Sequence, residues 1–581
     1  MVRILAGQNA SGSKIFRRLL AVLVVSLGCG APALLWAQAA PQPPNYNVGD
    51  AMQQAVPPET TDTTAKPSNA EAKPAVIVAE PEKPMALNAT EKILVRKIAV
   101  DETDEDIQAD LAEIVVPYQN RELSMKEINE VAGKVTRYYR NHGFIVARAY
   151  VPKQDATEGV LVMRVQRGGY GNMTVKNKSR LRDGVVEGSF RHMKGSSPGV
   201  TSQSLERTML LMREMPGGSM PIVTLEPGKA PGTTDLKVEV DREGYRYQGF
   251  LLGDNQGSSY TGRKRLFGEL DVNSPLGIAD KFSVSGMLSE GEGLHSVRAS
   301  YGLPLNYNGL RLTVAASRTR YALGGTYSAL DATGSVSAVE GTFSYPLQRS
   351  HDSNIDLSLN IAHRDLHDNL NAVGVFNPRT ADVSTVTLQR TKFGTVLGHR
   401  FYTSTSTAVT VGEVNEEDAA EAQSTGTNGD YSKLVVALSA DTPLNRVLSA
   451  RASLVMQKDL RVKYLDSSEQ LFISGSGGVR GYVEGSSGDN GYVFNVEFPY
   501  ALPKPPKARI QHSLSAFFDS GGVRAEKSGS SLTDYVLNDA GAGYTATLRP
   551  FYFKVQGVRL LGNIHSETSK TRAWFQLGFV F

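Results

Sequence analysis

Cysteine is almost absent from this chain. The 581 residues include one cysteine, Cys29, which falls within the first 40 residues, where the pattern is that of a removable leader. The mature chain would therefore hold no thiol, which excludes disulfides, thiol catalysis and thiolate metal sites. Only nine histidines are present, without an HExxH motif, and no paired-carboxylate cluster accompanies them. The sequence thus predicts a protein that is not an enzyme, has no metal site and needs no cofactor.

Long apolar runs and a strong net charge are also lacking. Beyond the leader, no segment offers the roughly 20 apolar residues of a transmembrane helix. The formal net charge is only +3, and no Lys/Arg run with interleaved aromatic residues is present, so nucleic acid is not an expected partner. A composition with 40% hydrophobic and 21% charged residues suits a soluble protein. It also suits a membrane β-barrel, because polar residues that face the lumen dilute the apolar ones.

The first 39 residues are predicted to be a signal peptide, 1–39. Basic residues precede an apolar run, and small residues stand where a signal peptidase would cut, after Ala39. An uncleaved helical anchor is the alternative, although Gly28 and Pro32 interrupt the apolar run. A lipoprotein box around Cys29 fits the surrounding residues less well. The signal peptide directs the chain beyond the inner membrane.

Residues 40–90 lack the apolar content of a folded core. They are rich in Pro, Ala, Thr and Glu, as in "AVPPETTDTTAKPSNAEAKPAV", a composition that is typical of a mobile linker. One exception, "NVGDAMQQAV" at about 47–56, predicts two or three helical turns. Because so short a helix is marginal alone, we expect it to dock against another part of the chain.

Two similar segments follow, at 91–167 and 168–242. In the first, "KILVRKIAV" predicts a strand, and "SMKEINEVAGKVTRYYRNHGF" predicts a helix that opens with a capping box of Ser124 and Glu127. Two further strands complete this segment. The second segment has a strand, two helices and two strands. We interpret the pair as a duplication of a small α+β domain with the order β-α-α-β-β and an open sheet edge.

From residue 245 to 581, alternation replaces the helical period. The last segment, "WFQLGFVF", places Phe575 and Leu577 on one face and Trp574 on the other, and it ends on Phe581. A soluble all-β domain is the alternative, but the segments approach the ~9–11 residues that cross a bilayer obliquely. An even number of such strands closes a sheet without an edge. The sequence therefore predicts a mainly β protein with a C-terminal 16-stranded antiparallel transmembrane β-barrel.

A glycine-rich stretch, "GSGGVRGYVEG", lies within a predicted loop at 460–490. It contains Arg480, and a solvated loop arginine is one interpretation. The next strand, "HSLSAFFDSGGV", favours another, because Phe517, Asp519 and Gly521 alternate and share one face. A carboxylate that faces lipid is costly, so Asp519 should face the lumen and pair with Arg480. Loss of one partner from such a pair costs about 3–5 kcal/mol.

Together these motifs resemble the outer-membrane transporters of two-partner secretion (TpsB) within the Omp85 superfamily, which include the haemolysin and filamentous-haemagglutinin transporters. The resemblance covers almost the whole mature chain and implies that the two repeats are POTRA domains, POTRA 1 at 91–167 and POTRA 2 at 168–242. It also implies that residues 245–581 form the barrel and that the helix at 47–56 plugs it. The residues involved are the lumen-loop motif Val479, Arg480, Gly481 and Tyr482; the wall motif Phe517, Asp519 and Gly521; the inward polar pair Asn495 and Glu497; the barrel-start motif Asp254, Asn255, Gly257 and Gly262; and Phe581 as the C-terminal insertion signal. Tyr482 is expected opposite Phe517.

The resemblance further implies a function. The partner would be one large TpsA-type exoprotein that arrives unfolded in the periplasm and is recognised through its N-terminal secretion domain by the POTRA domains. Strand addition at a sheet edge near 145–152 or 219–225 is the expected means of capture. The barrel, in the outer membrane of a Gram-negative bacterium, would export this partner to the cell surface or the medium. Outer-membrane lipid and, during biogenesis, the barrel-assembly machinery are the other expected partners.

Other functions remain open at this point. An insertase that assembles outer-membrane proteins is the alternative within the same superfamily, where the resemblance associates that role with more POTRA repeats. A diffusion porin fits less well, because a porin has no use for the repeats or for the loop motif.

Overall fold

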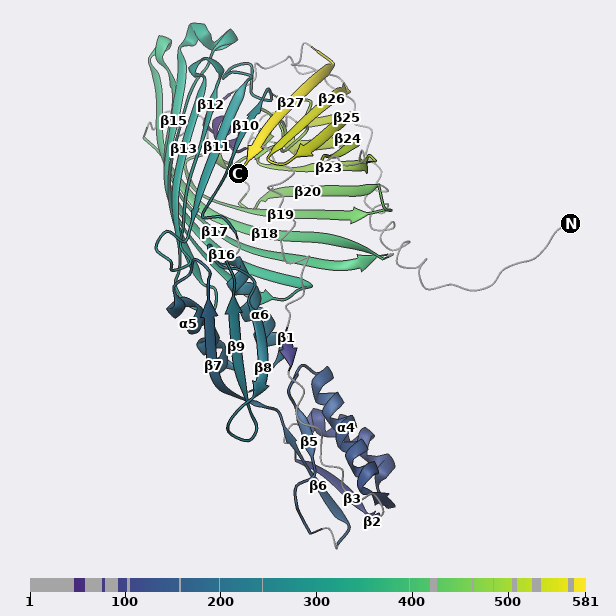
Figure 1. Cartoon of the computed structure of the whole chain (residues 1–581). Helices are drawn as coiled ribbons and strands as arrows, with labels where there is room; N and C mark the ends of the chain where they lie inside the picture. The colour runs from purple at the N-terminus through teal and green to yellow at the C-terminus, as the bar shows by residue number, and fades with distance from the viewer. Residues whose placement is uncertain are drawn as a thin grey trace, which may run out of the picture. The chain divides into compact units, whose positions relative to one another are not determined.

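The structure, a computed structural model, describes most of the chain (Figure 1). The described residues are 46–57, 76–78, 92–101, 105–155, 158–197, 199–242, 244–396, 398–417, 426–461, 464–483, 485–503, 509–524, 534–562 and 569–581. The predicted signal peptide and most of the predicted linker lie outside these residues. Within them, no helix has the length and apolar content needed to span a membrane.

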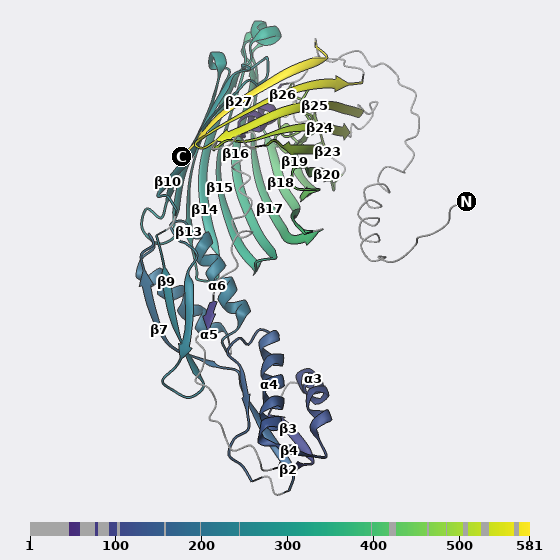
Figure 2. The same ribbon diagram turned by 45° about the vertical axis from the view of Figure 1, so that its right-hand side comes forward.

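Sixteen strands among the described residues form a closed antiparallel barrel in which each strand pairs with its neighbours in sequence. Their bounds are β10 (Tyr247–Asp254), β11 (Arg265–Asn273), β12 (Lys281–Ser289), β13 (Leu294–Pro304), β14 (Arg311–Ala322), β15 (Ala332–Arg349), β16 (Ser353–Leu370), β17 (Val375–Val396), β18 (His399–Glu416), β19 (Gly429–Pro443), β20 (Ser449–Asp459), β23 (Asn490–Ala501), β24 (Gln511–Arg524), β25 (Asp534–Leu548), β26 (Phe551–Leu561) and β27 (Thr571–Val580). The ring closes where β10 pairs with β27, side by side in Figure 2. The predicted mainly β fold with a sixteen-stranded barrel is confirmed.

Alternation along the strands separates an apolar outside from a filled lumen. In β27, Phe575 and Leu577 are 49% and 59% exposed, whereas Trp574 is 6% exposed. The lumen-facing side chains pack with α2 (Val48–Gln54), whose Val48 and Ala51 are fully buried. A water-filled or protein-filled interior with an apolar exterior is the pattern of a membrane barrel.

The helix α2 is the short helix expected at 47–56, and both views place it, in purple, inside the ring of strands (Figures 1 and 2). Asn47 caps it by accepting hydrogen bonds from the amides of Gly49 and Asp50, and the Asp50 carboxylate accepts one from the Asn47 amide. This capping box fixes the first turn of a helix that is too short to persist alone.

The first repeat contains two helices, one more than the sequence indicated clearly. Its elements are β2 (Lys92–Val95), β3 (Lys97–Asp101), α3 (Glu105–Val115), the 3₁₀ turn η2 (Val116–Tyr118), β4 (Arg121–Ser124), α4 (Met125–Asn141), β5 (Arg148–Tyr150) and β6 (Val160–Gln166). The sheet has the order β3-β6-β5, with β2 and β4 paired separately. The expected capping box is present, since the Glu127 amide donates to the Ser124 hydroxyl at 3.3 Å and the Glu127 carboxylate accepts from the Ser124 amide at 2.8 Å.

The second repeat recruits a strand from the segment predicted to be a mobile linker. Its own elements are β7 (Gly169–Asn177), α5 (Asp183–Ser196), α6 (Ser202–Glu214), β8 (Ile222–Pro227) and β9 (Thr233–Val240). The strand β1 (Val76–Val78) pairs in parallel with β8, and the sheet order is β1-β8-β9-β7. The linker prediction was therefore wrong at these three residues, because Val-Ile-Val suits a strand and an open sheet edge was within reach. The edge near 219–225 is consequently covered.

The remaining short elements lie in the loops of the barrel. They are η3 (Glu290–Glu292), η4 (Gly325–Leu330), η5 (Asn371–Val373), η6 (Ser467–Glu469), β21 (Leu471–Phe472) and β22 (Ser487–Gly488). The last three belong to the long loop between β20 and β23, and this loop carries the arginine motif.

Candidate functional site

The glycine-rich loop lies against the inner wall of the barrel rather than in solvent. Val479 is fully buried, and its amide donates to the carbonyl of Ile473 at 2.7 Å, which folds the loop tip back on itself. Ile473 packs with Val493 and Val523, which belong to the wall strands β23 and β24. Apolar contacts thereby hold the loop tip on the N-terminal side of the arginine.

Arg480 forms the expected ion pair with Asp519. Its Nε and Nη2 atoms donate to the two carboxylate oxygens at 2.7 and 2.9 Å, and Nη1 donates to Glu497 at 3.2 Å. The side chain of Asp519 is 0% exposed and that of Arg480 is 11% exposed. Two parallel charge-assisted hydrogen bonds of this kind are short and strongly directional. The guanidinium also lies over the ring of Phe517, 3.8 Å from its centroid, a favourable cation–π contact.

The inward polar pair completes this contact from the neighbouring strand. Asn495 lies directly opposite Asp519 in the β23–β24 register, and Glu497 lies opposite Phe517. The Asn495 side-chain amide donates to the Gly478 carbonyl at 2.8 Å and to Asp519 at 2.9 Å. Asn495 therefore links the loop backbone to the same carboxylate that binds the arginine. We call Arg480, Asp519, Glu497 and Asn495 the first anchor.

The motif glycines allow the loop to approach the wall. A Cβ atom on Gly521 would lie 2.9 Å from Cβ of Ile473 and 3.0 Å from a methyl group of Val479. A Cβ atom on Gly481 would lie 2.9 Å from the Asp539 carboxylate, to which the Gly481 amide donates. Any side chain at either position would push the loop away from the strands.

The side chain of Tyr482 does not lie where the sequence predicted. It was expected opposite Phe517, but its hydroxyl donates to the Leu561 carbonyl at 3.4 Å, and its ring packs with Val479 and Leu560. Phe517 instead lies beneath the guanidinium of Arg480. The cause is that the arginine takes the aromatic face, so the tyrosine turns towards β26.

Two further residues hold the loop tip, and the sequence analysis missed both. Asp539 on β25 lies directly opposite Asp519 and accepts from the Gly481 amide. Trp574 on β27 donates from its indole nitrogen to the Arg480 carbonyl at 3.1 Å. Alternation would have marked both as inward-facing, because Trp574 alternates with the outward Phe575 and Leu577, and a carboxylate is costly on a lipid face.

A second cluster of charges holds the other end of the loop, and no motif pointed to it. Arg379 on β17 is 4% exposed and donates at 2.7 Å to Asp466 of the loop and at 2.7 Å to Asp368 of β16. Glu469 of the loop pairs with Arg364 and, at 3.0 Å, with Lys433. Burial alone would raise the pKa of Glu469, but the charges of Lys433 and Arg364 outweigh it and lower that pKa. We call Arg379, Asp368 and Asp466 the second anchor.

The plug helix α2 rests on the second anchor. The Val48 amide at its N-terminus donates to Asp368 at 3.1 Å. Gly49 lies so close to the loop that a Cβ atom there would be 2.2 Å from the Ser467 carbonyl oxygen. A negative charge at a helix N-terminus is favourable. The plug, the loop and the wall therefore share the carboxylate of Asp368.

The barrel-start motif lies apart from the first anchor and receives the other end of α2. Asp254 forms a buried bidentate pair with Arg265 at 2.9 and 2.8 Å, and Arg265 donates to the Gln54 carbonyl at 3.2 Å. Asn255 bonds the backbone of β27 at Ala573 and Phe575. The motif thus connects the closing seam of the barrel to the plug.

The glycines of the barrel-start motif shape the first loop. The Gly257 amide donates to the Arg263 carbonyl at 2.9 Å, and a Cβ atom on Gly257 would lie 2.2 Å from the Gly262 carbonyl oxygen. Gly262 has a φ of +99°, which other residues rarely adopt. A tight turn of this kind needs glycine at both positions.

Phe581 lies at the closing seam. Its backbone exchanges two hydrogen bonds of 3.0 Å with Gly249 of β10, and its ring is 47% exposed on the outer face. It stacks on Phe579, with centroids 5.7 Å apart. This places the final aromatic residue where the predicted insertion signal would be accessible, and the role itself stays a prediction.

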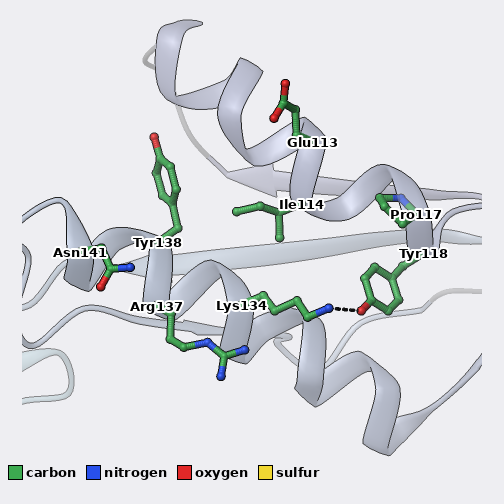
Figure 3. Close-up of a pocket in the computed structure, with 8 residues that line it drawn as sticks. All are labelled: Glu113, Ile114, Pro117, Tyr118, Lys134, Arg137, Tyr138 and Asn141. Carbon is green, nitrogen blue, oxygen red and sulfur yellow. Dashed lines mark hydrogen bonds between the residues drawn. The ribbon is translucent and has the colours of Figure 1, made fainter. Parts of the chain in front are cut away.

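The first repeat carries an open groove between α3–η2 and α4 (Figure 3). Ile114, Pro117 and Tyr118 line one side, and Lys134 reaches across to donate to the Tyr118 hydroxyl. The groove lies between helices rather than along the β5 edge, and the residues around it form no nucleophile–base pair.

Comparison with known proteins places this geometry in a family. A sequence profile described as haemolysin secretion/activation protein ShlB/FhaC/HecB matches residues 232–548, more than half of the chain. The chain belongs to this family. A second profile, the ShlB-type POTRA domain, matches residues 93–168, which identifies the first repeat as a POTRA domain. The predicted membership among two-partner secretion transporters is confirmed, and such a barrel belongs in an outer membrane.

Individual relatives support the same conclusion. The heme/hemopexin transporter protein HuxB of Haemophilus influenzae (strain 86-028NP) is 25% identical over 490 residues, which cover 82% of this chain and 85% of that protein. The outer membrane transporter CdiB of Escherichia coli is 26% identical over 476 residues, covering 76% and 74%. The solved structure of CdiB from Escherichia coli superposes with a TM-score of 0.70 at 20% identity and full coverage of both chains, a likeness of fold. This two-partner secretion transporter exports a partner exoprotein, as its family does.

Proposed function

We propose that this transporter captures one large, unfolded TpsA-type exoprotein in the periplasm with its POTRA domains and passes it through the barrel to the cell surface. The observation that carries the proposal is the lumen itself: a long loop and a helix fill it, and buried ion pairs hold both in addition to apolar contacts. Such contacts form and break as units, which suits a pore that is closed at rest and opens when an exoprotein passes through it.

Capture is proposed at the β5 edge of the first repeat. The sheet order β3-β6-β5 leaves β5 paired on one side only among the described residues. The alternative edge at β8 is already paired with β1. An unpaired edge offers main-chain groups to an extended peptide, which gains affinity without sequence-specific contacts. An unfolded exoprotein provides such a peptide in its secretion domain.

Crosslinking tests which edge is used. Tyr150 in β5 and Ile222 in β8 are matched in exposure, at 37% and 42%, and the only native cysteine is Cys29 in the predicted leader. With a short thiol-reactive crosslinker, Tyr150→Cys should give about tenfold more adduct with the secretion domain than Ile222→Cys, because β1 blocks the β8 edge. Adduct that forms mainly at Ile222→Cys would mean that the exoprotein displaces β1 instead.

Transport needs an energy source, and the sequence contains no P-loop. We propose that folding of the exoprotein outside the cell draws the chain outward, since a folded segment cannot re-enter the lumen. The loop and α2 must then vacate the path, at least in part. The second anchor, where α2 meets the loop, supplies the contacts that such a movement would break.

Co-expression tests the function as a whole. The chain and a candidate TpsA-type exoprotein are produced in a host that lacks both, and the medium and cell surface are assayed for the exoprotein. We expect secretion only when both are present, with unchanged levels of other outer-membrane proteins. A general loss of barrel proteins on depletion of this chain from its own cell would favour the insertase alternative.

The proposed contact of Phe581 with the barrel-assembly machinery predicts poorer insertion, not poorer export per inserted barrel, when Phe581 is removed.

A further inference from the structure

The outer face of β12–β15 carries two arginines and no acidic residue. The exposed Val297, Val314 and Val339 define the outward-facing positions of β13, β14 and β15. Every outward position in these strands and in β12 is apolar, Gly, Ser, Thr, Tyr or His, apart from Arg318 and Arg320 in β14 and Gln348 after the bulge in β15. Both arginines are exposed, and neither has a hydrogen-bond or ion-pair partner among the described residues. Two unpaired cations on a lipid-facing wall are costly unless they reach headgroups or water.

The arginines lie where the apolar belt ends. Along β14 the outward residues run from Leu312 and Val314 through Ala316 to the two arginines. On β16 the same change occurs after Ile361, where His363 follows. The apolar part of β14 lies at the end of the barrel where β10 follows the second repeat. The arginines lie towards the opposite end. With the POTRA domains in the periplasm, as proposed above, the arginines are at the level of the outer leaflet.

A shallow groove of about 380 Å³ lies beside Arg318 on this face. Val297, Ala299, Ala316 and Val339 form its apolar floor. Arg318 and Ser337 add polar groups, and His363 and Asp365 of β16 also line the groove. The small side chains of Ala299 and Ala316 lie between the larger valines, which creates the depression. A groove with an apolar floor and a cation at one end matches an amphipathic lipid with an anionic headgroup.

One acidic residue, Asp365, lines the groove, and it lies beside a histidine. Asp365 on β16 lies 3.6 Å from the imidazole of His363, and the other imidazole nitrogen lies 2.7 Å from Asp382. Arg318 faces Ser337 in the register of β15, so a full strand separates it from Asp365. The Arg318 side of the groove is therefore cationic and exposed, whereas the β16 side carries the carboxylate of Asp365.

We propose that this groove is a binding site for a phosphorylated, acylated glycolipid of the outer leaflet. An acyl chain lies along Val297, Ala316 and Val339, and a phosphate group accepts hydrogen bonds from Arg318 and Arg320. The two arginines are two residues apart on one strand face, about 7 Å between Cα atoms, so both guanidinium groups reach one phosphate. Guanidinium groups bind phosphate oxygens in a bidentate manner. The site rests on the proposed orientation of the chain but not on the identity of the exoprotein.

Native mass spectrometry of the full chain in a mild non-ionic detergent tests the site. Diphosphorylated lipid A is titrated against its dephosphorylated form and against phosphatidylethanolamine. We expect the diphosphorylated lipid to bind at least tenfold more tightly than the dephosphorylated one. The double variant R318Q/R320Q should bind both forms equally, at the level of the dephosphorylated lipid, because the phosphate contacts are gone.

Two further variants separate this site from general lipid binding. Arg559→Gln removes an outward-facing, exposed arginine of β26 that does not line this groove, and it should bind as the wild type does. Ala316→Phe fills the groove without changing charge and should weaken the diphosphorylated lipid about tenfold. Three results would overturn the proposal. Wild type and R318Q/R320Q could bind diphosphorylated lipid A equally, or Arg559→Gln could lose as much affinity for this lipid as R318Q/R320Q does. The third is a dimer of the chain that R318Q/R320Q dissociates while lipid binding persists. A difference in gel mobility between heated and unheated samples confirms that each variant retains the folded barrel.

Discussion

Arg480→Ala should reduce secretion of the exoprotein by at least about a hundredfold while the barrel still inserts and folds. The substitution leaves Asp519 fully buried without its cation and removes the ring contact with Phe517. An uncompensated buried charge costs about 3–5 kcal/mol, enough to shift the loop from its anchored position by two orders of magnitude or more. Asp519→Asn should act similarly, because it removes the bidentate partner of the arginine and leaves only the single contact with Glu497. The measurement is exoprotein in the medium per folded barrel in the outer membrane.

The matched control for Arg480 is another ion-paired lumen arginine. Arg298 pairs with Glu340, but its side chain is 45% exposed, and exposed pairs contribute about 0–1 kcal/mol. Arg298→Ala should therefore secrete near the wild-type level. Arg480→Lys keeps the charge but loses the bidentate geometry, so we expect an intermediate level. Wild-type secretion by Arg480→Ala and Asp519→Asn, or equal losses in Arg298→Ala, would mean that the first anchor has no role in export.

Much of the barrel and of the first anchor could be predicted because both depend on short-range patterns. Strand alternation has a period of two residues, so each strand identifies its own lumen face. Asp519 between Phe517 and Gly521 on such a face marks a buried carboxylate, and Arg480 was the cation in the nearest loop. The position of Tyr482 could not be predicted in this way, because it depends on whether Arg480 or Tyr482 packs against the ring of Phe517.

The second anchor could not be predicted because no local pattern encodes it. Arg379 and Asp466 are 87 residues apart and meet only because the loop crosses the lumen. Each alone resembles an ordinary lumen-lining charge of a wide barrel. The strand β1 was missed for a related reason: three β-branched residues in a Pro-rich stretch carry little signal, and the pairing with β8 comes from the open edge.

Arg379→Gln should open the pore. The substitution leaves Asp466 and Asp368 without their shared cation, and Asp368 also holds the N-terminal amide of α2. Loss of about 3 kcal/mol at this point raises the population of chains with a displaced plug by about a hundredfold. The measurement is single-channel conductance in planar bilayers together with uptake of a large antibiotic by whole cells. Arg390→Gln, an exposed arginine on the same strand, is the matched control and should leave conductance unchanged.

Deletion of residues 46–57 decides how Arg379 acts. If Arg379 keeps the pore closed by holding the plug, Arg379→Gln adds no conductance in a chain that already lacks α2. If it acts only through the loop, the two changes raise conductance independently, because α2 and the loop block different parts of the lumen. The shared contact of Asp368 with Val48 and Arg379 favours the first outcome. Since the first anchor is intact in Arg379→Gln, its secretion should exceed that of Arg480→Ala, which assigns closure to one anchor and export to the other.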